Sequence, residues 1–186
     1  MTEPGQARHV DDIDWSTWQP KDRATLLFVI RDGRVLLIRK KRGLGAGKIN
    51  GPGGRLDPGE TPLQAAIRET QEEVCITPRD VTFCGELSFQ FVDGYSIHGY
   101  VFRASRFDGE PCSTEEADPL WFSIDEMPYA EMWADDEYWF PLLLEGTPFR
   151  GRFLFDADRM LSMAIAREPD SLYDPDVDTA TEGVKR

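Results

Sequence analysis

A glycine-rich loop that runs directly into a capped helix is the feature that most constrains this chain. Residues 43–59 read GLGAGKINGPGGRLDPG, a composition that favours turns over regular secondary structure. Thr61 then offers a favourable N-cap, Pro62 suits the first helical position, and Gln64 completes a capping box. These signals predict a helix that starts at Pro62 and ends near Val74.

The predicted helix places Glu69, Glu72 and Glu73 on one turn, where like charges three and four residues apart repel each other. A positive group is therefore expected among them. Hard divalent cations prefer oxygen ligands, and Mg²⁺ takes one or two carboxylates together with waters and substrate phosphates. The cluster is a candidate magnesium site, with a solvated acidic helix face as the alternative. The inner face of the helix is expected to consist of Leu63, Ala66, Ile67 and Thr70.

Apolar runs of period two, each interrupted by an Asp-Gly pair, predict two β-hairpins elsewhere in the chain. The first hairpin joins residues 25–30 to residues 35–38, and the second joins residues 81–92 to residues 95–104. Shorter patterns add strands at 120–122, 149–155 and 160–166, and a helix at 136–145.

Helices inserted into a mixed β-sheet indicate an α+β fold whose layers form an α/β/α sandwich. We expect one domain over residues 23–167, because a chain of 186 residues has the length of a single core. Residues 1–22 are predicted to be a polar N-terminal extension, and residues 168–186 an acidic C-terminal tail.

The charge of the chain excludes some classes of partner. A formal net charge of -13 and a pI near 4.6 disfavour binding to nucleic-acid polymers, which requires a basic surface. The longest apolar run, residues 24–30, is far shorter than the roughly 20 residues that cross a bilayer, so no membrane segment is predicted. A basic group formed by residues 39–42 and Lys48 suggests a local phosphate-binding patch, with a solvated strand end as the alternative.

The three cysteines, Cys75, Cys84 and Cys112, are odd in number and show no CxxC spacing. We interpret them as structural residues without a disulfide framework, as is typical of a reducing cytoplasm. The polar N-terminus does not have the pattern of a signal peptide. We therefore expect a cytoplasmic protein, and we expect it to be a monomer.

The segment from Gly54 to Ile76 resembles the Nudix box, the signature of hydrolases that act on a nucleoside diphosphate linked to another moiety. The resemblance is carried by Gly54, by Glu60 and by the pairs Arg68-Glu69 and Glu72-Glu73. It implies a Nudix fold in which the helix of the box packs on a mixed sheet.

The resemblance also implies Mg²⁺-dependent hydrolysis, with Mn²⁺ as a possible substitute because both cations accept oxygen ligands. The implied metal ligands are Glu69, Glu72, Glu73, Glu116 and the carbonyl oxygen of Gly53. The implied catalytic residues are Arg68, Glu69, Glu73 and Glu116, with Arg68 orienting the glutamates through ion pairs. From the residues alone, Glu116 can equally be an ordinary loop acid.

Two further segments, Lys40–Gly54 and Met132–Leu144, resemble the Nudix branch that hydrolyses oxidised purine nucleoside triphosphates such as 8-oxo-dGTP and 2-hydroxy-dATP. The products implied are a monophosphate and pyrophosphate, and the implied role is sanitation of the nucleotide pool. Some residues depart from the usual patterns. They are Thr70 at an apolar position, Cys75 where a glycine usually closes the helix, and Ile49 where a large aromatic is common.

In the branch that the chain resembles, Asp135 and Asp136 read the purine edge, Asn50 adds a hydrogen bond, and Trp133 stacks on the base. The predicted substrate-binding set also contains Trp139, Lys40, Thr25, Leu44, Phe89, Phe91 and Ile97. From the residues alone, an aspartate that caps the helix at 136–145 and tryptophans in the core are the alternative.

Two adjacent carboxylates in a partly dry pocket do not both ionise easily, so Asp135 and Asp136 are predicted to share a proton. A shared proton allows the pair either to donate or to accept, which would accommodate both an oxidised guanine and an oxidised adenine. Alternative functions are hydrolysis of ADP-ribose, a dinucleotide or O6-methyl-dGTP, and nucleotide binding without turnover.

Overall fold

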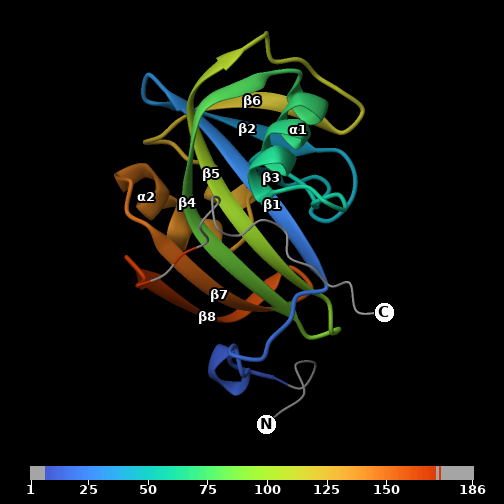
Figure 1. Ribbon diagram of the computed structural model, residues 1–186, viewed down its shortest axis with the longest axis vertical. Helices are drawn as coiled ribbons and strands as arrows, with labels where there is room; N and C mark the ends of the chain where they lie inside the picture. Colours follow the sequence, from blue (N-terminus) through green and yellow to red (C-terminus); the bar gives the residue numbers. More distant parts are fainter. Residues whose placement is uncertain (1–6, 171, 173–186) are drawn as a thin grey trace.

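Two β-hairpins form the centre of a mixed sheet, as predicted (Figure 1). In the first hairpin, β1 (Asp22–Arg31) pairs antiparallel with β2 (Arg34–Lys40). In the second, β4 (Thr77–Phe91) pairs antiparallel with β5 (Ser96–Asp108). The first turn contains Asp32, which adopts a positive φ of 53° beside a glycine, as Asp-Gly hairpin turns require. The structure is a computed structural model that describes residues 7–170 and residue 172.

The hairpins are joined side by side, since β1 and β5 pair in parallel. The strand order is β3-β2-β1-β5-β4-β7-β8, with β6 paired to β2 and β7 parallel to β4. The remaining strands are β3 (Ile49–Asn50), β6 (Ala117–Ser123), β7 (Phe149–Asp156) and β8 (Arg159–Arg167). The predicted strands at 120–122, 149–155 and 160–166 are therefore confirmed.

The helices begin and end where local signals indicate. In α1 (Pro62–Val74) the Thr61 hydroxyl accepts from the Gln64 backbone, and the Gln64 side chain accepts from the Thr61 backbone. Cys75 ends α1 in the left-handed conformation, with φ of 67°, at the position where glycine is usual. The second helix, α2 (Asp136–Glu145), spans the predicted residues.

The sheet lies between the two helices, which confirms the predicted α/β/α layers (Figure 1). Successive residues of a strand point to opposite faces. On β1, Leu27 therefore joins the cluster that contains Ala66 of α1, whereas Phe28 contacts Trp139 and Phe140 of α2. The two apolar clusters hold the helices against opposite faces of the same sheet.

The buried face of α1 differs from the prediction. Ala66 and Thr70 are fully buried as expected, but Leu63 and Ile67 are only partly buried. Glu73, placed to one side in the prediction, is buried with 2% exposure. A helical pattern of apolar residues does not predict a buried carboxylate. Here the backbone amide of Gly53, from the loop before α1, donates a hydrogen bond to the Glu73 carboxylate.

Part of the predicted N-terminal extension packs on the sheet. It contains a short 3-10 helix, η2 (Val10–Asp12), and its Val10 and Ile13 are buried in a cluster with Leu154 of β7. A second 3-10 helix, η3 (Tyr129–Glu131), precedes α2. Residues 1–6 and most of the predicted acidic tail, 168–186, lie outside the described residues, so the proposed domain boundaries remain predictions.

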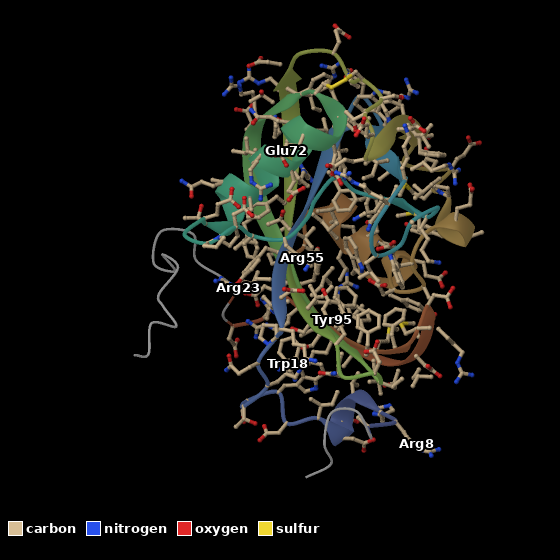
Figure 2. The ribbon with its side chains drawn as sticks, turned by 90° about the vertical axis from the view of Figure 1, so that its right-hand side faces the viewer. Arg8, Trp18, Arg23, Arg55, Glu72 and Tyr95 are labelled. Atoms are coloured by element: carbon tan, nitrogen blue, oxygen red, sulfur yellow. A yellow bond between two sulfur atoms is a disulfide. The ribbon has the colours of Figure 1, made fainter. Side chains whose placement is uncertain are left out.

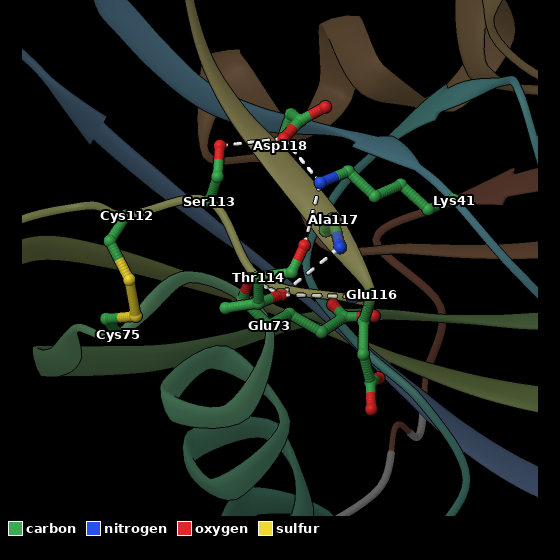
Figure 3. The surroundings of a disulfide bond; sticks show 9 residues. All are labelled: Lys41, Glu73, Cys75, Cys112, Ser113, Thr114, Glu116, Ala117 and Asp118. Carbon is green, nitrogen blue, oxygen red and sulfur yellow. Dashed lines mark hydrogen bonds and ion pairs between the residues drawn. A yellow bond between two sulfur atoms is a disulfide. The ribbon is translucent and has the colours of Figure 1, made fainter.

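The expectation of three unpaired cysteines is wrong. Cys75 and Cys112 form a disulfide with a Cα to Cα distance of 5.7 Å, although 37 residues separate them in the sequence (Figure 3). Spacing gave no signal because the fold alone brings the end of α1 beside the loop between β5 and β6. Cys84 is free, and burial raises the pKa of its thiol to about 11.

Within residues 7–170 and at residue 172, no helix is both long and apolar enough to span a bilayer.

Candidate active site

One pocket of about 310 Å³ collects most of the residues that the sequence nominated. It lies between α1, the glycine-rich loop, the β4–β5 hairpin and the segment before α2. Carboxylates of α1 line one part of the pocket, and a pair of aspartates lines another. The nominated lining residues are Thr25, Lys40, Leu44, Asn50, Gly53, Glu69, Glu73, Phe89, Phe91, Ile97, Glu116, Trp133, Asp135 and Asp136.

The glycine-rich loop approaches β1 and α1 so closely that side chains would not fit. A Cβ at Gly53 would lie 1.9 Å from the carbonyl oxygen of Thr25. A Cβ at Gly54 would lie 2.4 Å from the carboxyl carbon of Glu69. The amide of Gly53 donates a 2.9 Å hydrogen bond to Glu73 Oε2. The glycines therefore bring backbone amides and carbonyls beside the acidic helix turn.

Burial perturbs the carboxylates that face the pocket. It raises the pKa of Glu73 to about 7, because desolvation outweighs the hydrogen bond from Gly53. It also raises the pKa of Glu69, although Arg68 opposes the shift. One buried acid, Glu73, and one partly buried acid, Glu69, therefore have raised pKa values in a site where a bound cation would favour their charged forms.

Arg68 is the positive group that the glutamate cluster required. Its guanidinium donates to Glu60 at 2.6 and 2.8 Å, to Glu69 at 2.9 Å and to Glu72 at 3.1 Å. These contacts include the ion pairs predicted for Glu69 and Glu72, and Arg68 lowers the pKa of Glu60. Arg68 and Glu72 lie outside the pocket lining, and the Glu72 side chain is 52% exposed.

Glu116 reaches the pocket from the loop that precedes β6, where its carboxylate pairs with Arg42. The hydroxyl of Thr114 donates to the Glu73 carbonyl at 2.9 Å and accepts from the Glu116 amide at 3.2 Å (Figure 3). The disulfide at Cys112 attaches the same loop to the end of α1. The loop and the helix are thus tied together by two kinds of bond.

Across the described residues, no three acidic, histidine or cysteine side chains are grouped to hold a metal ion. Arg68 engages Glu69 and Glu72, and Arg42 engages Glu116, so the carboxylates point to protein cations. The predicted ligand set therefore remains a prediction.

The other part of the pocket contains two buried aspartates. Asp135 and Asp136 are each 2% exposed, and burial raises the pKa of both carboxyls. For Asp136 the neighbouring charge of Asp135 adds to the rise. Asp136 Oδ2 accepts from the Trp133 amide at 3.1 Å, and Asp135 Oδ1 has no hydrogen-bond partner. Two such carboxyls favour a protonated form over a doubly charged pair.

Two buried oxygen atoms of the pocket lack partners. They are Asp135 Oδ1 and the Thr25 hydroxyl, the only such side-chain atoms found in the described part of the chain. Buried polar groups are normally hydrogen-bonded, so these atoms are suited to a polar ligand. Nearby, Asn50 uses its Oδ1 to accept from the Gly51 amide at 2.8 Å. This bond uses the oxygen of the Asn50 side chain, so the amide nitrogen of Asn50 takes no part in it.

The prediction that Trp139 lines the substrate pocket is wrong. Trp139 is fully buried in the core and lies outside the pocket lining. Its indole nitrogen donates a 2.8 Å hydrogen bond to Asp135 Oδ2. The spacing of four residues between Asp135 and Trp139 could have indicated this contact, because residues four apart lie on the same side of a helix.

Sequence reasoning missed several lining residues, including Tyr95, Phe155 and Arg55. Tyr95 follows the hairpin turn, and its hydroxyl donates to Asp22 at 2.6 Å. Phe155 comes from β7, and only the parallel pairing with β4 brings it to the pocket. Period-two patterns identify an apolar face but do not reveal which neighbour it meets.

A mixed sheet between two helices, with an acidic helix packed beside a glycine-rich loop, is the architecture of a Nudix domain. The chain belongs to this family, since the NUDIX domain family matches residues 20–143.

Curated relatives cover most of the chain. It is 46% identical over 132 residues to the oxidized purine nucleoside triphosphate hydrolase of Danio rerio, covering 70% of this chain and 85% of that protein. It is 44% identical over 149 residues to the protein of the same name from Mus musculus, covering 79% and 95%.

A similar solved structure is the MutT mutator protein of Bacillus halodurans, with a TM-score of 0.70 and 28% identity. The alignment covers 77% of this chain and 97% of that one. The likeness extends the family assignment from the sequence to the three-dimensional fold.

Proposed function

We propose that the protein hydrolyses oxidised purine nucleoside triphosphates, such as 8-oxo-dGTP and 2-hydroxy-dATP, to a monophosphate and pyrophosphate. One observation carries the proposal: a single pocket joins the acidic turn of α1 to the buried pair Asp135 and Asp136. The names of the zebrafish and mouse relatives support the same substrate class. Removal of damaged triphosphates would sanitise the nucleotide pool and prevent DNA damage.

The chemistry of the donor atoms fits a divalent cation, although in the described residues the acidic side chains are paired with arginines and not grouped around a cation. The buried carboxylate of Glu73 and the partly buried carboxylate of Glu69, both with raised pKa values, lie beside a glycine-rich backbone and are hard oxygen donors that suit Mg²⁺ or Mn²⁺. The residues that would hold it are Glu69, Glu72, Glu73, Glu116 and the Gly53 carbonyl. When bound, such a cation neutralises phosphate charge and lowers the pKa of coordinated water.

The chain itself supplies positioning around the phosphates. Arg68 restrains the side chains of Glu69 and Glu72 through hydrogen bonds, which reduces their freedom before substrate arrives. Lys40 and Arg42 line the pocket beside the acidic turn, where their charge can attract and orient a triphosphate. An anionic phosphorus is difficult to attack, so this charge balance favours the reaction.

Recognition of the base would fall to the aspartates. Asp135 Oδ1 is buried without a partner, and one proton shared with Asp136 would let the pair donate to a carbonyl or accept from an N–H. Trp133 lines the same region and offers a ring for stacking. Oxidised guanine and oxidised adenine present different donors and acceptors, which such a pair would accommodate.

We further propose that the protein acts as a monomer in the cytoplasm on free nucleotides. The net charge of -13 supports the exclusion of nucleic-acid polymers, which attract basic proteins. The cytoplasmic location and the monomeric state remain predictions from the sequence, and the location no longer has the support of unpaired cysteines, because Cys75 and Cys112 are bonded.

The test is kcat/KM with Mg²⁺ for 8-oxo-dGTP, 2-hydroxy-dATP, O6-methyl-dGTP, dGTP and ADP-ribose. Glu73→Gln serves as the blank, and Glu115→Gln, an exposed acid close to Glu116, is the matched control. We expect preference for an oxidised purine triphosphate, lost in the blank and retained in the control. Preference for ADP-ribose would contradict the base assignment. Tight nucleotide binding without product would contradict the proposed hydrolysis and favour a nucleotide-binding module.

A further inference from the structure

The segment of residues 7–18 covers the sheet directly behind the pocket. On β7, Phe153 and Phe155 belong to the pocket-side core, and Leu154 between them points to the opposite face. There it meets Val10 and Ile13 of the N-terminal segment. This segment lies before residue 20, where the match to the NUDIX domain family begins.

A chain of hydrogen bonds runs from this segment to the backbone of the β4–β5 turn. The Trp18 indole nitrogen donates to Gln90 Oε1 at 2.9 Å. Gln90 is 2% exposed, and its amide nitrogen donates to the carbonyls of Phe91 at 2.9 Å and Tyr95 at 3.0 Å. One side chain therefore connects the N-terminal segment to both ends of the β4–β5 turn. Figure 2 shows Trp18 and Tyr95 at the same end of the molecule.

The turn held in this way forms part of the pocket wall. Phe91 and Tyr95 both line the pocket, and their ring centroids are 5.8 Å apart. The Tyr95 hydroxyl is fixed separately by Asp22 at 2.6 Å. Gln90 thus secures the backbone of the turn from behind, and Asp22 secures a side chain of the turn. A shift of this backbone would move two aromatic rings in the pocket.

We propose that Trp18 and Gln90 are positioning residues that set the aromatic wall of the pocket and thereby its preference for an oxidised purine. The inference rests on the proposed function, because it names which substrate property the wall controls. Neither side chain lines the pocket, so their effect would pass through Phe91 and Tyr95. A mutation far from the reacting atoms can still lower activity strongly when it misplaces the substrate by about 1 Å.

The test compares Trp18→Phe with Trp15→Phe. Both substitutions keep an aromatic ring and remove one indole donor, but the Trp15 donor contacts only the Val10 carbonyl, at 2.8 Å, within the segment. For Trp18→Phe we expect KM for 8-oxo-dGTP to rise about three- to tenfold, the range set by one net hydrogen bond, with kcat unchanged. The kcat/KM ratio of 8-oxo-dGTP to dGTP should fall, and Trp15→Phe should retain it.

A double-mutant cycle with Gln90→Met examines the connection itself. Because Trp18 and Gln90 act in one chain, the KM effect of the double variant should be smaller than the product of the single effects. Thermal unfolding of every variant identifies those that fail to fold, and binding of 8-oxo-dGMP gives a readout without turnover.

The outcomes separate the two proposals. A wild type that shows no preference for the oxidised purine overturns the proposed function and this inference together. If the wild type shows the preference and Trp18→Phe keeps it, the positioning role alone is overturned, even if Trp18→Phe unfolds at a lower temperature. Multiplicative effects in the double-mutant cycle would likewise overturn transmission through Gln90.

Discussion

The indole nitrogen of Trp139 donates a 2.8 Å hydrogen bond to Asp135 Oδ2, on the side of the aspartate that faces the core. The other oxygen of the same carboxyl is buried and has no partner in the protein. A core residue thus fixes one oxygen and leaves the second for a ligand. This arrangement connects the packing of α2 with the proposed recognition of a base.

Substitution Trp139→Phe should weaken both stability and base recognition. It leaves a buried carboxyl oxygen without its donor, which costs about 1–3 kcal/mol in the free energy of unfolding. Because the indole lowers the pKa of Asp135, its loss should raise that pKa further. Urea unfolding and kcat/KM against pH measure the two effects. Trp121→Phe, which alters a half-buried tryptophan away from the pocket, should leave the pH profile unchanged.

The pair Asp135 and Asp136 should make stability fall as pH rises. Burial raises the pKa of both carboxyls, so the folded chain keeps a proton that the unfolded chain releases near its ordinary pKa of 3.8. Above that pH, and up to the raised folded-state values, the free energy of unfolding decreases as pH increases. Asp136→Asn does not carry this titratable proton, so its stability relative to wild type should improve as pH rises above the ordinary pKa of 3.8.

Urea unfolding across this pH range tests the sign. The exposed Asp125→Asn is the control, and its stability relative to wild type should stay constant. A relative stability of Asp136→Asn that declines with pH would show that the buried pair is charged in the folded protein.

Addition of Mg²⁺ should raise the unfolding temperature. A cation that binds only the folded chain stabilises it by about 2.7 kcal/mol at a hundredfold excess over its Kd. Glu73→Gln should abolish the shift, because this residue is 2% exposed and faces the pocket, whereas Glu115→Gln should retain it. An equal shift in all three proteins would place the cation elsewhere. Calorimetric titration with Mg²⁺ alone provides the affinity without any turnover.

Reduction of the disulfide should destabilise the protein and reduce kcat. Cys75 and Cys112 are exposed to solvent, so a reductant can reach them. Loss of a bond that closes 37 residues of chain costs about 2–4 kcal/mol. The loop that carries Glu116 would also lose its covalent attachment to α1 and keep only the hydrogen bonds from Thr114 to Glu73 and from Cys112 to Val74.

Thermal unfolding and kcat, each with and without dithiothreitol, measure these losses. A Cys84→Ser background leaves only the bridged pair to respond. Identical unfolding temperatures in both conditions would show that the bond contributes nothing to stability.

Local signals in the sequence determined much of this protein. The capping box of Thr61 and Gln64 set the start of α1, and the Asp-Gly pairs set both hairpins, because these signals act between residues a few positions apart. The spacing of the Nudix box likewise nominated Glu69 and Glu73, which both line the pocket.

Only the tertiary structure decided which surfaces meet. Glu73 is buried because a distant loop supplies the Gly53 amide, and Trp139 lies in the core because α2 packs on β1 and β7. The bond between Cys75 and Cys112 and the contact between Trp18 and Gln90 likewise join residues far apart in the sequence. The periodicity of apolar residues predicts that a side chain will be buried, but it does not predict which residue that side chain will contact. Contacts between distant segments depend on how the whole sheet is assembled.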